Sequence, residues 1–277
     1  MIVCVDTNVV RDLSEGRVSN AQVYEAAIRK KVQGGRLIIA PSFEVLGELL
    51  QSPDADFKCR IENAQFYDSV VDWGTALKPS SRILKDDIAA FIRHRRPSVP
   101  YSSIDDQKSG FIKAIRNGED VFPETVSARV YEETRHQNNK FVETVLERFQ
   151  SQVSEQNCQE LRNAPEETWR RWWIHGGVAH ALAWSLIQGE LVPSGLSPLS
   201  FPSLRTSVGY LLRTWHQIIC SRRKVRPTDH HDFRIAVQGA TVGRLLTHDR
   251  RLRNIICSIP GLSVKMWTLE EFMSHLH

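Results

Sequence analysis

Two short apolar runs, near opposite ends of the 277-residue chain, each stop at an acidic residue. The first, IVCV at residues 2–5, is followed directly by Asp6. The second, RLLT at residues 244–247, is followed by His248 and Asp249. A short, β-branched, apolar run that ends in polar residues is typical of a buried strand, and open α/β sheets bind their ligands at the carboxyl ends of the strands. We therefore expect a buried sheet with carboxylates at its carboxyl edge.

Helix and strand patterns alternate around both runs. Residues 20–33 have helical spacing, and residues 36–40 (RLIIA) form a further apolar run. A helical pattern at about 229–241 precedes RLLT, and VKMW at 264–267 and a terminal helix from Thr268 follow it. Alternating helices and strands favour βαβ units. The prediction is an α/β fold with a central, mostly parallel sheet.

The stretch from 52 to 204 interrupts this alternation. It contains long helical patterns and turn-rich breaks but few convincing strands. We predict a discontinuous α/β domain, formed by residues 1–51 and 205–277, with a helical insertion at 52–204. The Pro-, Ser- and Gly-rich piece 193–203 is expected to lead back into the α/β core.

Composition narrows the class of protein. The chain is 41% hydrophobic and 25% charged, which is typical of a soluble globular protein, and its net charge of +4 permits an anionic partner without indicating a dedicated nucleic-acid arm. Its five cysteines are scattered and odd in number, so we expect neither a disulfide framework nor a zinc cluster, and a reducing, cytoplasmic location. The opening MIVCVDTNVV is unlike a signal peptide, and no run approaches the roughly 18 apolar residues of a membrane span.

A second acidic motif follows the RLIIA run. Ser42 is a candidate N-cap for a helix that carries Glu44 and Glu48 on one face. Glu48 lies between Leu46 and Leu49 of the apolar stripe, so we favour Glu48 over Glu44 as the residue drawn toward the sheet. The alternative is that both carboxylates belong to a solvated helix face.

A third acidic motif is RPTDHHDFRIAVQGA, at residues 226–240. Asp229 and Asp232 lie three residues apart at the start of the predicted helix, on one face and near its positive end. Helix capping explains one of them but explains two less well. Asp232 immediately precedes the apolar residue Phe233, so we expect Asp232 near the packed sheet.

Carboxylates gathered in this way require a cation, because like charges raise each other's pKa and no lysine in these motifs offsets the repulsion. Oxygen ligands suit Mg²⁺ or Mn²⁺, and the lack of nearby cysteines and ordered histidine pairs argues against zinc. Such ions supply what hydrolysis of a phosphodiester needs, namely an activated water and neutralisation of the phosphate charge.

Five motifs together resemble those of the PIN-domain family, in family order. VCVDTNVV resembles the opening motif, VLGELL the second, DHHDFRIA the third, LLTHD the fourth, and VKMWTLEEF the terminal strand and helix. The resemblance covers about residues 1–51 and 205–277. It implies a three-layer α/β/α fold and cleavage of single-stranded RNA that depends on one or two Mg²⁺ or Mn²⁺ ions, without a covalent enzyme intermediate.

The resemblance also implies roles for individual residues. It places Asp6, Glu48, Asp232 and Asp249 in the metal-binding acidic set, with Asp229 as an additional candidate. Asn8 and Thr247 resemble the polar residues that orient this set. The long insertion departs from the compact family form, so a neighbouring antitoxin cannot be carried over from the small toxin ribonucleases, and a homodimer is left open.

A basic cluster and three histidines adjoin the acidic motifs. We expect the cluster to hold substrate phosphates, although a solvated helix end explains it equally well; it consists of Arg222, Arg223, Lys224 and Arg226. The histidines are candidates to protonate a leaving group, with an ordinary surface or supporting role as the more economical interpretation; they are His230, His231 and His248.

Three other functions compete with the ribonuclease. A DNA nuclease similar to the flap endonucleases shares the acidic architecture, but the sequence shows no helix-hairpin-helix with a Gly-rich phosphate loop. A catalytically inactive PIN-like module would bind RNA or a protein, and the retention of all four acidic positions counts against it. A dehalogenase-type phosphatase with Asp6 as its nucleophile needs a second aspartate where this chain has Asn8.

Overall fold

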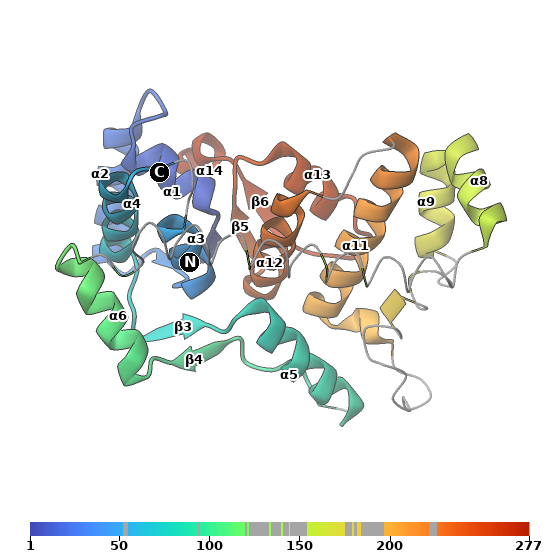
Figure 1. Cartoon of the computed structure of the whole chain (residues 1–277), viewed down its shortest axis with the longest axis horizontal. Coiled ribbons are helices and arrows are strands. Elements are labelled where there is room, and N and C mark those ends of the chain that lie inside the picture. The colour runs from blue at the N-terminus through green and yellow to red at the C-terminus, as the bar shows by residue number, and fades with distance from the viewer. Residues whose placement is uncertain are drawn as a thin grey trace.

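A four-stranded parallel sheet lies at the centre of the protein, in the order β2-β1-β5-β6 (Figure 1). The computed structural model describes residues 1–51, 55–93, 95–119, 154–174, 197–221 and 226–276, together with positions 121, 133, 140, 144, 179, 182 and 183. The strands are β1 (Ile2–Val5), β2 (Ile38–Ile39), β5 (Arg244–Leu246) and β6 (Lys265–Trp267). The prediction of an α/β fold with a parallel sheet is confirmed.

The order in which the chain adds strands to the sheet changes sides at β1, although all the strands are parallel. The chain passes from β1 to β2 on one side and later returns as β5 on the other side of β1, where Cys4 pairs with Leu245. In open α/β sheets such a topological switch point opens a crevice at the carboxyl ends of the two strands. The residues that follow these two ends include Asp6 and Asp249, as the sequence predicts.

One face of the sheet is covered by α12 (Pro227–Val242), which contacts β1 and β5. Behind α12 lies α11 (Pro202–Ser221), which also contacts α13 (Arg250–Cys257). A Cβ on Gly239 of α12 would lie 3.0 Å from the Cβ of Leu245, so glycine allows α12 to approach β5 this closely. The helix then ends at Gly243, whose φ of 78° suits a residue without a side chain, and β5 begins at the next residue.

The opposite face is covered by helices from both ends of the chain. They are α1 (Thr7–Ser14), α2 (Ala21–Gln33), α4 (Phe57–Val70) and α14 (Leu269–Leu276). Val3 and Val5 of β1 and Leu246 of β5 point to this side and line an apolar space together with residues of these four helices. Helices on both faces of the sheet make the three-layer α/β/α arrangement that we expected.

Ser42 begins α3 (Phe43–Leu50) as predicted, because its hydroxyl accepts hydrogen bonds from the backbone N–H groups of Glu44 and Val45. α3 packs against α4, and α4 also contacts α1 and contributes to the main core. A helix that follows residue 51 therefore shares the core of the α/β unit. The division of the chain at residues 51 and 204 stays a prediction.

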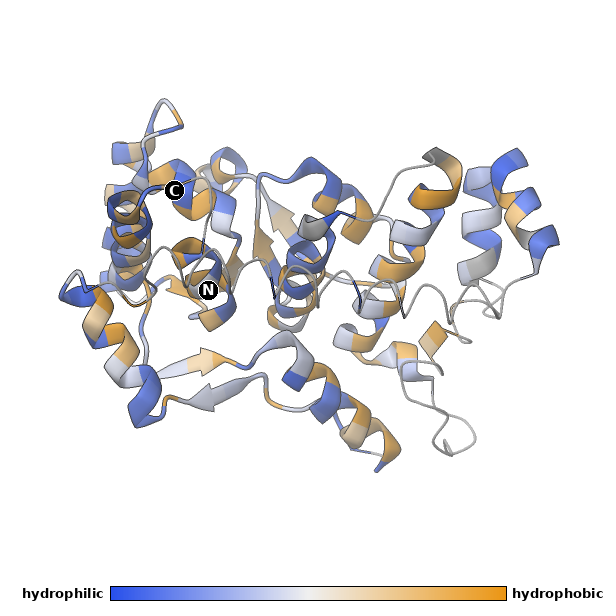
Figure 2. Cartoon of the chain, viewed as in Figure 1, coloured by the Kyte–Doolittle hydropathy of each residue, from blue (hydrophilic) through white to orange (hydrophobic). Residues whose placement is uncertain are grey.

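The stretch that we expected to be helical also contains strands, and this corrects that part of the prediction. Thr75–Leu77 (β3) and Tyr101–Ser103 (β4) form an antiparallel pair, with Ala76 opposite Ser102. Both strands are only three residues long, and Figure 2 shows β4 in pale colours and β3 only partly in orange, so neither produces an apolar run in the sequence. The other elements described in this stretch are α4, α5 (Ser80–Ile92), α6 (Asp106–Arg116), α8 (Glu155–Asn163), α9 (Pro165–Ile174) and η1 (Pro198–Ser200).

Two further expectations concern this part of the chain. The connector predicted at 193–203 is described only from residue 197 onward, where η1 leads into α11. Among the helices that the structure describes, none combines the length and the apolar character that a membrane crossing requires.

Candidate functional site

Asp6 occupies the switch point between β1 and β5. Its backbone N–H donates to the carbonyl oxygen of Leu246 at 2.9 Å, and only 6% of the residue is exposed. Burial raises the pKa of Asp6 to about 6, and the negative charge of Glu48 adds to the rise. Asp249 raises the pKa of Asp6 further, whereas a hydrogen bond from Thr247 opposes the rise. Within the described residues no lysine or arginine pairs with this carboxylate, so its charge is poorly compensated.

Thr247 connects the two strand-end carboxylates. Its hydroxyl donates to Oδ2 of Asp6 at 2.6 Å and accepts from the backbone N–H of Asp249 at 3.0 Å. The residue is completely buried. One threonine side chain thus contacts both Asp6 and the start of the turn that carries Asp249. Its orienting role in a metal-binding set stays a prediction.

Asn8 contributes to the site through its backbone. Its side chain lies on the exposed side of α1, while a hydrogen bond from its backbone lowers the pKa of Asp6. An orienting role for the Asn8 side chain stays a prediction.

Glu48 faces the same region from α3. Its Oε2 accepts a 2.6 Å hydrogen bond from the hydroxyl of Thr7, the residue after Asp6, and lies 3.9 Å from Nδ1 of His231. Glu44, one turn earlier on α3, has different partners. Its Oε1 accepts from the backbone N–H and the hydroxyl of Ser80, both at 3.0 Å, and pairs with the guanidinium of Arg234 at 2.8 Å. Glu44 therefore anchors the start of α5. Its side chain is 7% exposed and that of Glu48 is 27% exposed, so the expectation that Glu48 is the more inward of the two is wrong, although the charge of Glu48 raises the pKa of Asp6.

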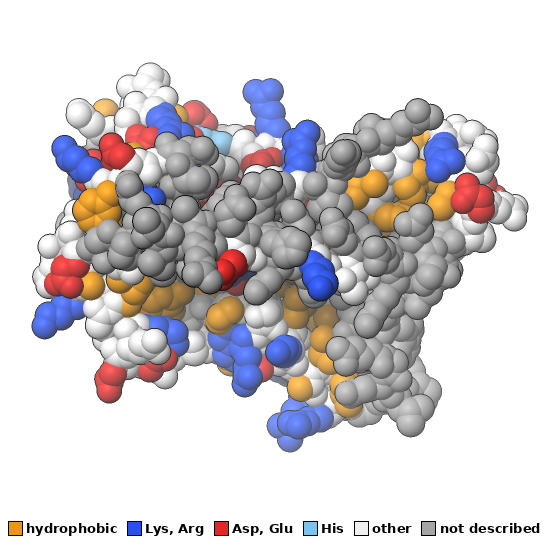
Figure 3. Space-filling view, viewed as in Figure 1, with side chains coloured by type: hydrophobic (Ala, Val, Ile, Leu, Met, Phe, Trp, Pro, Cys, Tyr) orange, Lys and Arg blue, Asp and Glu red, His pale blue; other side chains and the backbone are white. Residues whose placement is uncertain are grey.

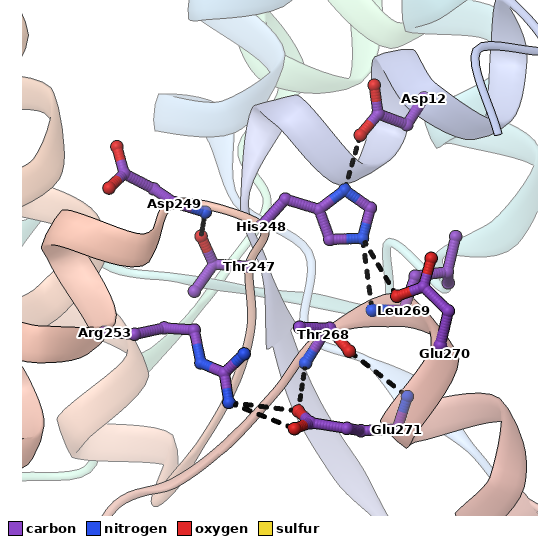
Figure 4. Close-up of polar contacts among 9 residues, drawn as sticks. All are labelled: Asp12, Thr247, His248, Asp249, Arg253, Thr268, Leu269, Glu270 and Glu271. Atoms are coloured by element: carbon purple, nitrogen blue, oxygen red, sulfur yellow. Dashed lines mark hydrogen bonds and ion pairs between the residues drawn. The ribbon is translucent and has the colours of Figure 1, made fainter.

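Asp249 begins α13 as its N-cap. Its Oδ1 accepts from the backbone N–H of Leu252 at 2.8 Å, which leaves Oδ2 without a hydrogen bond among the described residues. Figure 4 shows the Asp249 carboxylate on the opposite side of the chain from the His248 ring. His248 and Asp249 are consecutive in the chain, but their side chains point to opposite sides of it, and only Asp249 points toward the acidic set.

His248 has a structural environment. Its Nδ1 lies 2.5 Å from Oδ2 of Asp12 on α1, and its Nε2 accepts from the backbone N–H of Leu269 at 3.2 Å (Figure 4). An acceptor at Nε2 places the ring proton on Nδ1, where it is donated to Asp12. His248 therefore joins the end of β5 to α1 and α14. It lies on the opposite side of the chain from the Asp249 carboxylate.

His230 is also unsuited to donate a proton. Burial lowers the pKa of His230 to about 3, and the charges of Arg234 and His231 lower it further. The ring is neutral at physiological pH. Of the three histidines, only His231 lies beside a carboxylate of the acidic set, Glu48.

Asp232 and Asp229 share an arginine that we did not identify from the sequence. Nη1 of Arg251 contacts Oδ1 of Asp229 at 2.6 Å, and Nη2 contacts Oδ2 of Asp232. Burial raises the pKa of Asp232 to about 8, with Arg251 opposing the rise and Asp249 and Asp6 adding to it. The negative charges of Asp249 and Asp6 therefore raise the pKa of Asp232, although its direct partner is the guanidinium of Arg251.

Asp229 has partners at both of its carboxylate oxygens. Oδ2 accepts from the backbone N–H of Arg226 at 2.8 Å, and Oδ1 contacts Arg251. Asp229 thus stabilises the start of α12, which is the capping role that we weighed from the sequence. Its assignment as an additional metal ligand stays a prediction.

A signal for Arg251 exists in the sequence. It lies two residues after Asp249, in the first turn of a helix, where a positive charge is unfavourable unless a carboxylate compensates it. Two carboxylates of α12 do so. The partner could be found only once α12 and α13 were placed side by side.

The predicted basic cluster is mostly outside the described residues. Arg222, Arg223 and Lys224 fall there, and Arg226 is exposed just before α12. The role of these four residues in substrate binding stays a prediction.

The acidic set suits a hard divalent cation in its chemistry, since all its donors are carboxylate oxygens. Among the residues that the structure describes, however, no three His, Cys, Asp or Glu side chains form a ready-made metal site. The carboxylates are separated by their present hydrogen bonds: Glu48 bonds to Thr7, Asp249 to α13, and Asp232 to Arg251. Binding of Mg²⁺ or Mn²⁺ by these residues stays a prediction.

No family model matches the chain, and no curated protein or solved structure matches it either. The resemblance to PIN domains therefore rests on the sequence motifs alone.

Proposed function

We propose that this protein is a metal-dependent nuclease with a PIN-like catalytic core, and that its substrate is single-stranded RNA. One observation carries the proposal. At the switch point between β1 and β5, the negative charges of Glu48 and Asp249 add to the rise in the pKa of Asp6, and those of Asp249 and Asp6 add to the rise in the pKa of Asp232. Buried, mutually repelling carboxylates at such an edge are stabilised by a divalent cation.

The chain's own residues have separable roles in this proposal. Asp6 is the central ligand, because it is the most buried of the four and its pKa is raised by the charges of Glu48 and Asp249. Thr247 orients Asp6, and Thr7 holds Glu48 through the 2.6 Å hydrogen bond. Asp249 offers the oxygen that does not cap α13. When bound, Mg²⁺ or Mn²⁺ supplies an activated water and neutralises charge on the phosphate.

Support for a polyanionic substrate comes from the surface of α5. Lys85 lies on α5, and Arg93, Arg95 and Arg96 follow the end of the helix. All four are exposed and make no ion pair within the described residues, and we call them the α5 basic surface. Figure 3 shows Lys and Arg side chains gathered over this part of the molecule. α5 packs against α12, the helix that carries Asp232, and begins at the contact of Ser80 with Glu44. Exposed cations on and just after a helix that packs against α12 suit a phosphate backbone.

A second candidate is a metal-free module that binds RNA or a protein. The contacts of Arg251 favour it, because an arginine already compensates Asp229 and Asp232. In that case the acidic set would be a structural ion-pair network. The same experiment separates the two functions.

The test is cleavage of labelled single-stranded RNA and single-stranded DNA by the purified protein, with Mn²⁺, Mg²⁺ or EDTA. RNA cleavage that requires the metal supports the proposal. Cleavage of DNA but not RNA would instead support the alternative function, a DNA nuclease similar to the flap endonucleases. RNA binding without cleavage under any metal condition would support the metal-free module instead.

A further inference from the structure

Asp87 of α5 is a carboxylate buried without a cation. Only 1% of the residue is exposed. Its Oδ1 accepts from the backbone N–H of Ser98 at 2.8 Å and from the Ser98 hydroxyl at 3.0 Å, and its Oδ2 accepts from the hydroxyl of Ser203. Among the described residues no lysine or arginine pairs with Asp87, and the ion pairs of α5 are made by Asp86 instead. A buried carboxylate of this kind depends on its hydrogen bonds, so the groups that donate them are held firmly.

The segment that leads from α5 to β4, residues 95–100, is fixed along its length. At its start, the backbone N–H of Arg95 donates to the carbonyl oxygen of Ala90 at 2.8 Å. At its end, the carbonyl oxygen of Pro100 accepts from the backbone N–H of Lys78 at 2.8 Å. The hydrogen bonds to the buried carboxylate lie between these two points. The segment is therefore a defined turn with a buried anchor at its centre.

The anchor also joins the turn to α11. Ser203 lies in the first turn of α11, and α5 and α11 pack against each other (Figure 1). Phe91 of α5 and Phe201 meet edge to face, with ring centroids 5.7 Å apart, and Leu204 completes a small core separate from the main one. The end of α5 thus rests on a packed base that does not involve the sheet.

The anchored segment carries two cations of the α5 basic surface. Arg95 and Arg96 are exposed and make no ion pair within the described residues. A position just beyond a helix C-terminus favours a positive charge without any ligand, and this is the competing explanation of the two arginines. A helix end does not require that the backbone beside them be fixed by a buried carboxylate. Cations on a fixed backbone lose less freedom when a ligand binds, so the anchor favours binding.

We propose that residues 95–100 form a preorganised binding site for the phosphate backbone of single-stranded RNA, and that Asp87 is the positioning residue that fixes this site through Ser98. The inference rests on the proposed function and refines it. The sign of the effect separates it from simple electrostatics. Removal of a negative charge would by itself strengthen the binding of a polyanion, whereas loss of the anchor weakens it.

Ser98 and Ser203 provide a matched pair of variants, because each donates a hydroxyl to Asp87 and only Ser98 belongs to the anchored segment. The affinity for a labelled single-stranded RNA is measured by fluorescence anisotropy in EDTA, so that no metal-dependent cleavage occurs. We expect Ser98→Ala to bind about threefold more weakly than the wild type, and Ser203→Ala to bind equally well. Urea unfolding shows that both variants are folded under the conditions of the assay.

Asp87→Ala removes all three hydrogen bonds and should bind RNA about tenfold more weakly, although the variant is more positive than the wild type. This variant can fail to fold, so Ser98→Ala is also combined with Arg95→Gln and Arg96→Gln. In the background without the two arginines, Ser98→Ala should have no further effect on affinity, because no cation remains for the anchor to position. A general loss of structure would lower the affinity in both backgrounds.

The outcomes separate the inference from the function beneath it. The inference is overturned by equal affinities of the wild type and Ser98→Ala, by equal losses in Ser98→Ala and Ser203→Ala, by a Ser98→Ala loss that persists without the arginines, or by tighter binding in a folded Asp87→Ala variant. Each of these results leaves the proposed nuclease standing. A wild type that binds no RNA overturns the inference, and it overturns the proposed function as well if RNA is not cleaved with Mn²⁺ or Mg²⁺.

Discussion

The hydroxyl of Thr247 donates a 2.6 Å hydrogen bond to Oδ2 of Asp6, and both groups are buried at the end of the strand pair β1–β5. This bond favours the charged form of Asp6 against the burial that raises its pKa. It links the sequence motifs at the two ends of the chain, 241 residues apart. Several properties of the candidate site depend on it.

Thr247→Val keeps the shape of the side chain and removes the hydrogen bond. The pKa of Asp6 should rise further, so the pH at which Mn²⁺ binding is half-maximal should move upward. Loss of the buried bond should also lower the free energy of unfolding by about 1 to 2 kcal/mol. The control is Thr241→Val, which removes a hydroxyl bonded to the α12 backbone. Equal pH midpoints for wild type and Thr247→Val would contradict the role assigned to this bond.

Asp6→Asn should stabilise the metal-free protein, and the gain should depend on pH. Burial raises the pKa of Asp6 from 3.8 to about 6, so the folded state binds the proton more tightly than the unfolded state. Wild-type stability is therefore lost as the pH rises from about 4 to 6, by up to about 3 kcal/mol. Asparagine cannot ionise, so its advantage should be small at pH 4 and largest above pH 6. Urea unfolding at pH 4, 5, 6 and 7 measures this, and a pH-independent difference would be inconsistent with the burial of a charged Asp6.

Glu44 and Glu48 form a matched pair, since they lie one turn apart on the same helix and have different partners. Glu44→Gln should weaken the contacts with Ser80 and Arg234 and lower the free energy of unfolding by about 1 to 3 kcal/mol, with Mn²⁺ affinity unchanged. Glu48→Gln should lower Mn²⁺ affinity at least tenfold, with little loss of stability. Calorimetric titration and urea unfolding of both variants check this. The reverse pattern would show that Glu44 is the ligand.

The α5 basic surface should contribute to RNA affinity through phosphate contacts. The triple variant Arg93→Gln, Arg95→Gln, Arg96→Gln should bind a single-stranded RNA roughly tenfold more weakly and reduce the salt slope of the affinity by about 2, if each arginine contacts one phosphate. The comparison is a triple variant of exposed cations elsewhere in the chain, Lys30→Gln, Arg36→Gln, Lys58→Gln. Fluorescence anisotropy over a range of salt concentrations measures both. Equal losses in the two triple variants would mean that only net charge matters.

Local patterns predict much of this fold, because the decisive features lie within a few residues. The β-branched run before Asp6 and the Ser42 cap of α3 are such features, and both appear in the structure as predicted. β3 and β4 were not predicted, since three-residue strands of moderate hydropathy form only when a neighbouring strand pairs with them.

The candidate site is less predictable, because its contacts join distant elements. Glu44 and Glu48 share one helix face, and only the position of α5 distinguishes them. Arg251 meets Asp229 and Asp232 only after α13 packs beside α12. No local pattern names a partner on another helix.

The central claim is that Asp6 and Glu48 act on the same bound ion, and a double-mutant cycle tests it most directly. Single-turnover cleavage of a labelled single-stranded RNA with Mn²⁺ would be measured for wild type, Asp6→Asn, Glu48→Gln and the double variant. Residues that act as a unit give strongly non-additive losses. We predict that each single variant loses at least about a hundredfold in rate, which is about 2.7 kcal/mol, and that the double variant is little worse than either. Full activity in folded Asp6→Asn, or losses that simply add, would contradict the account.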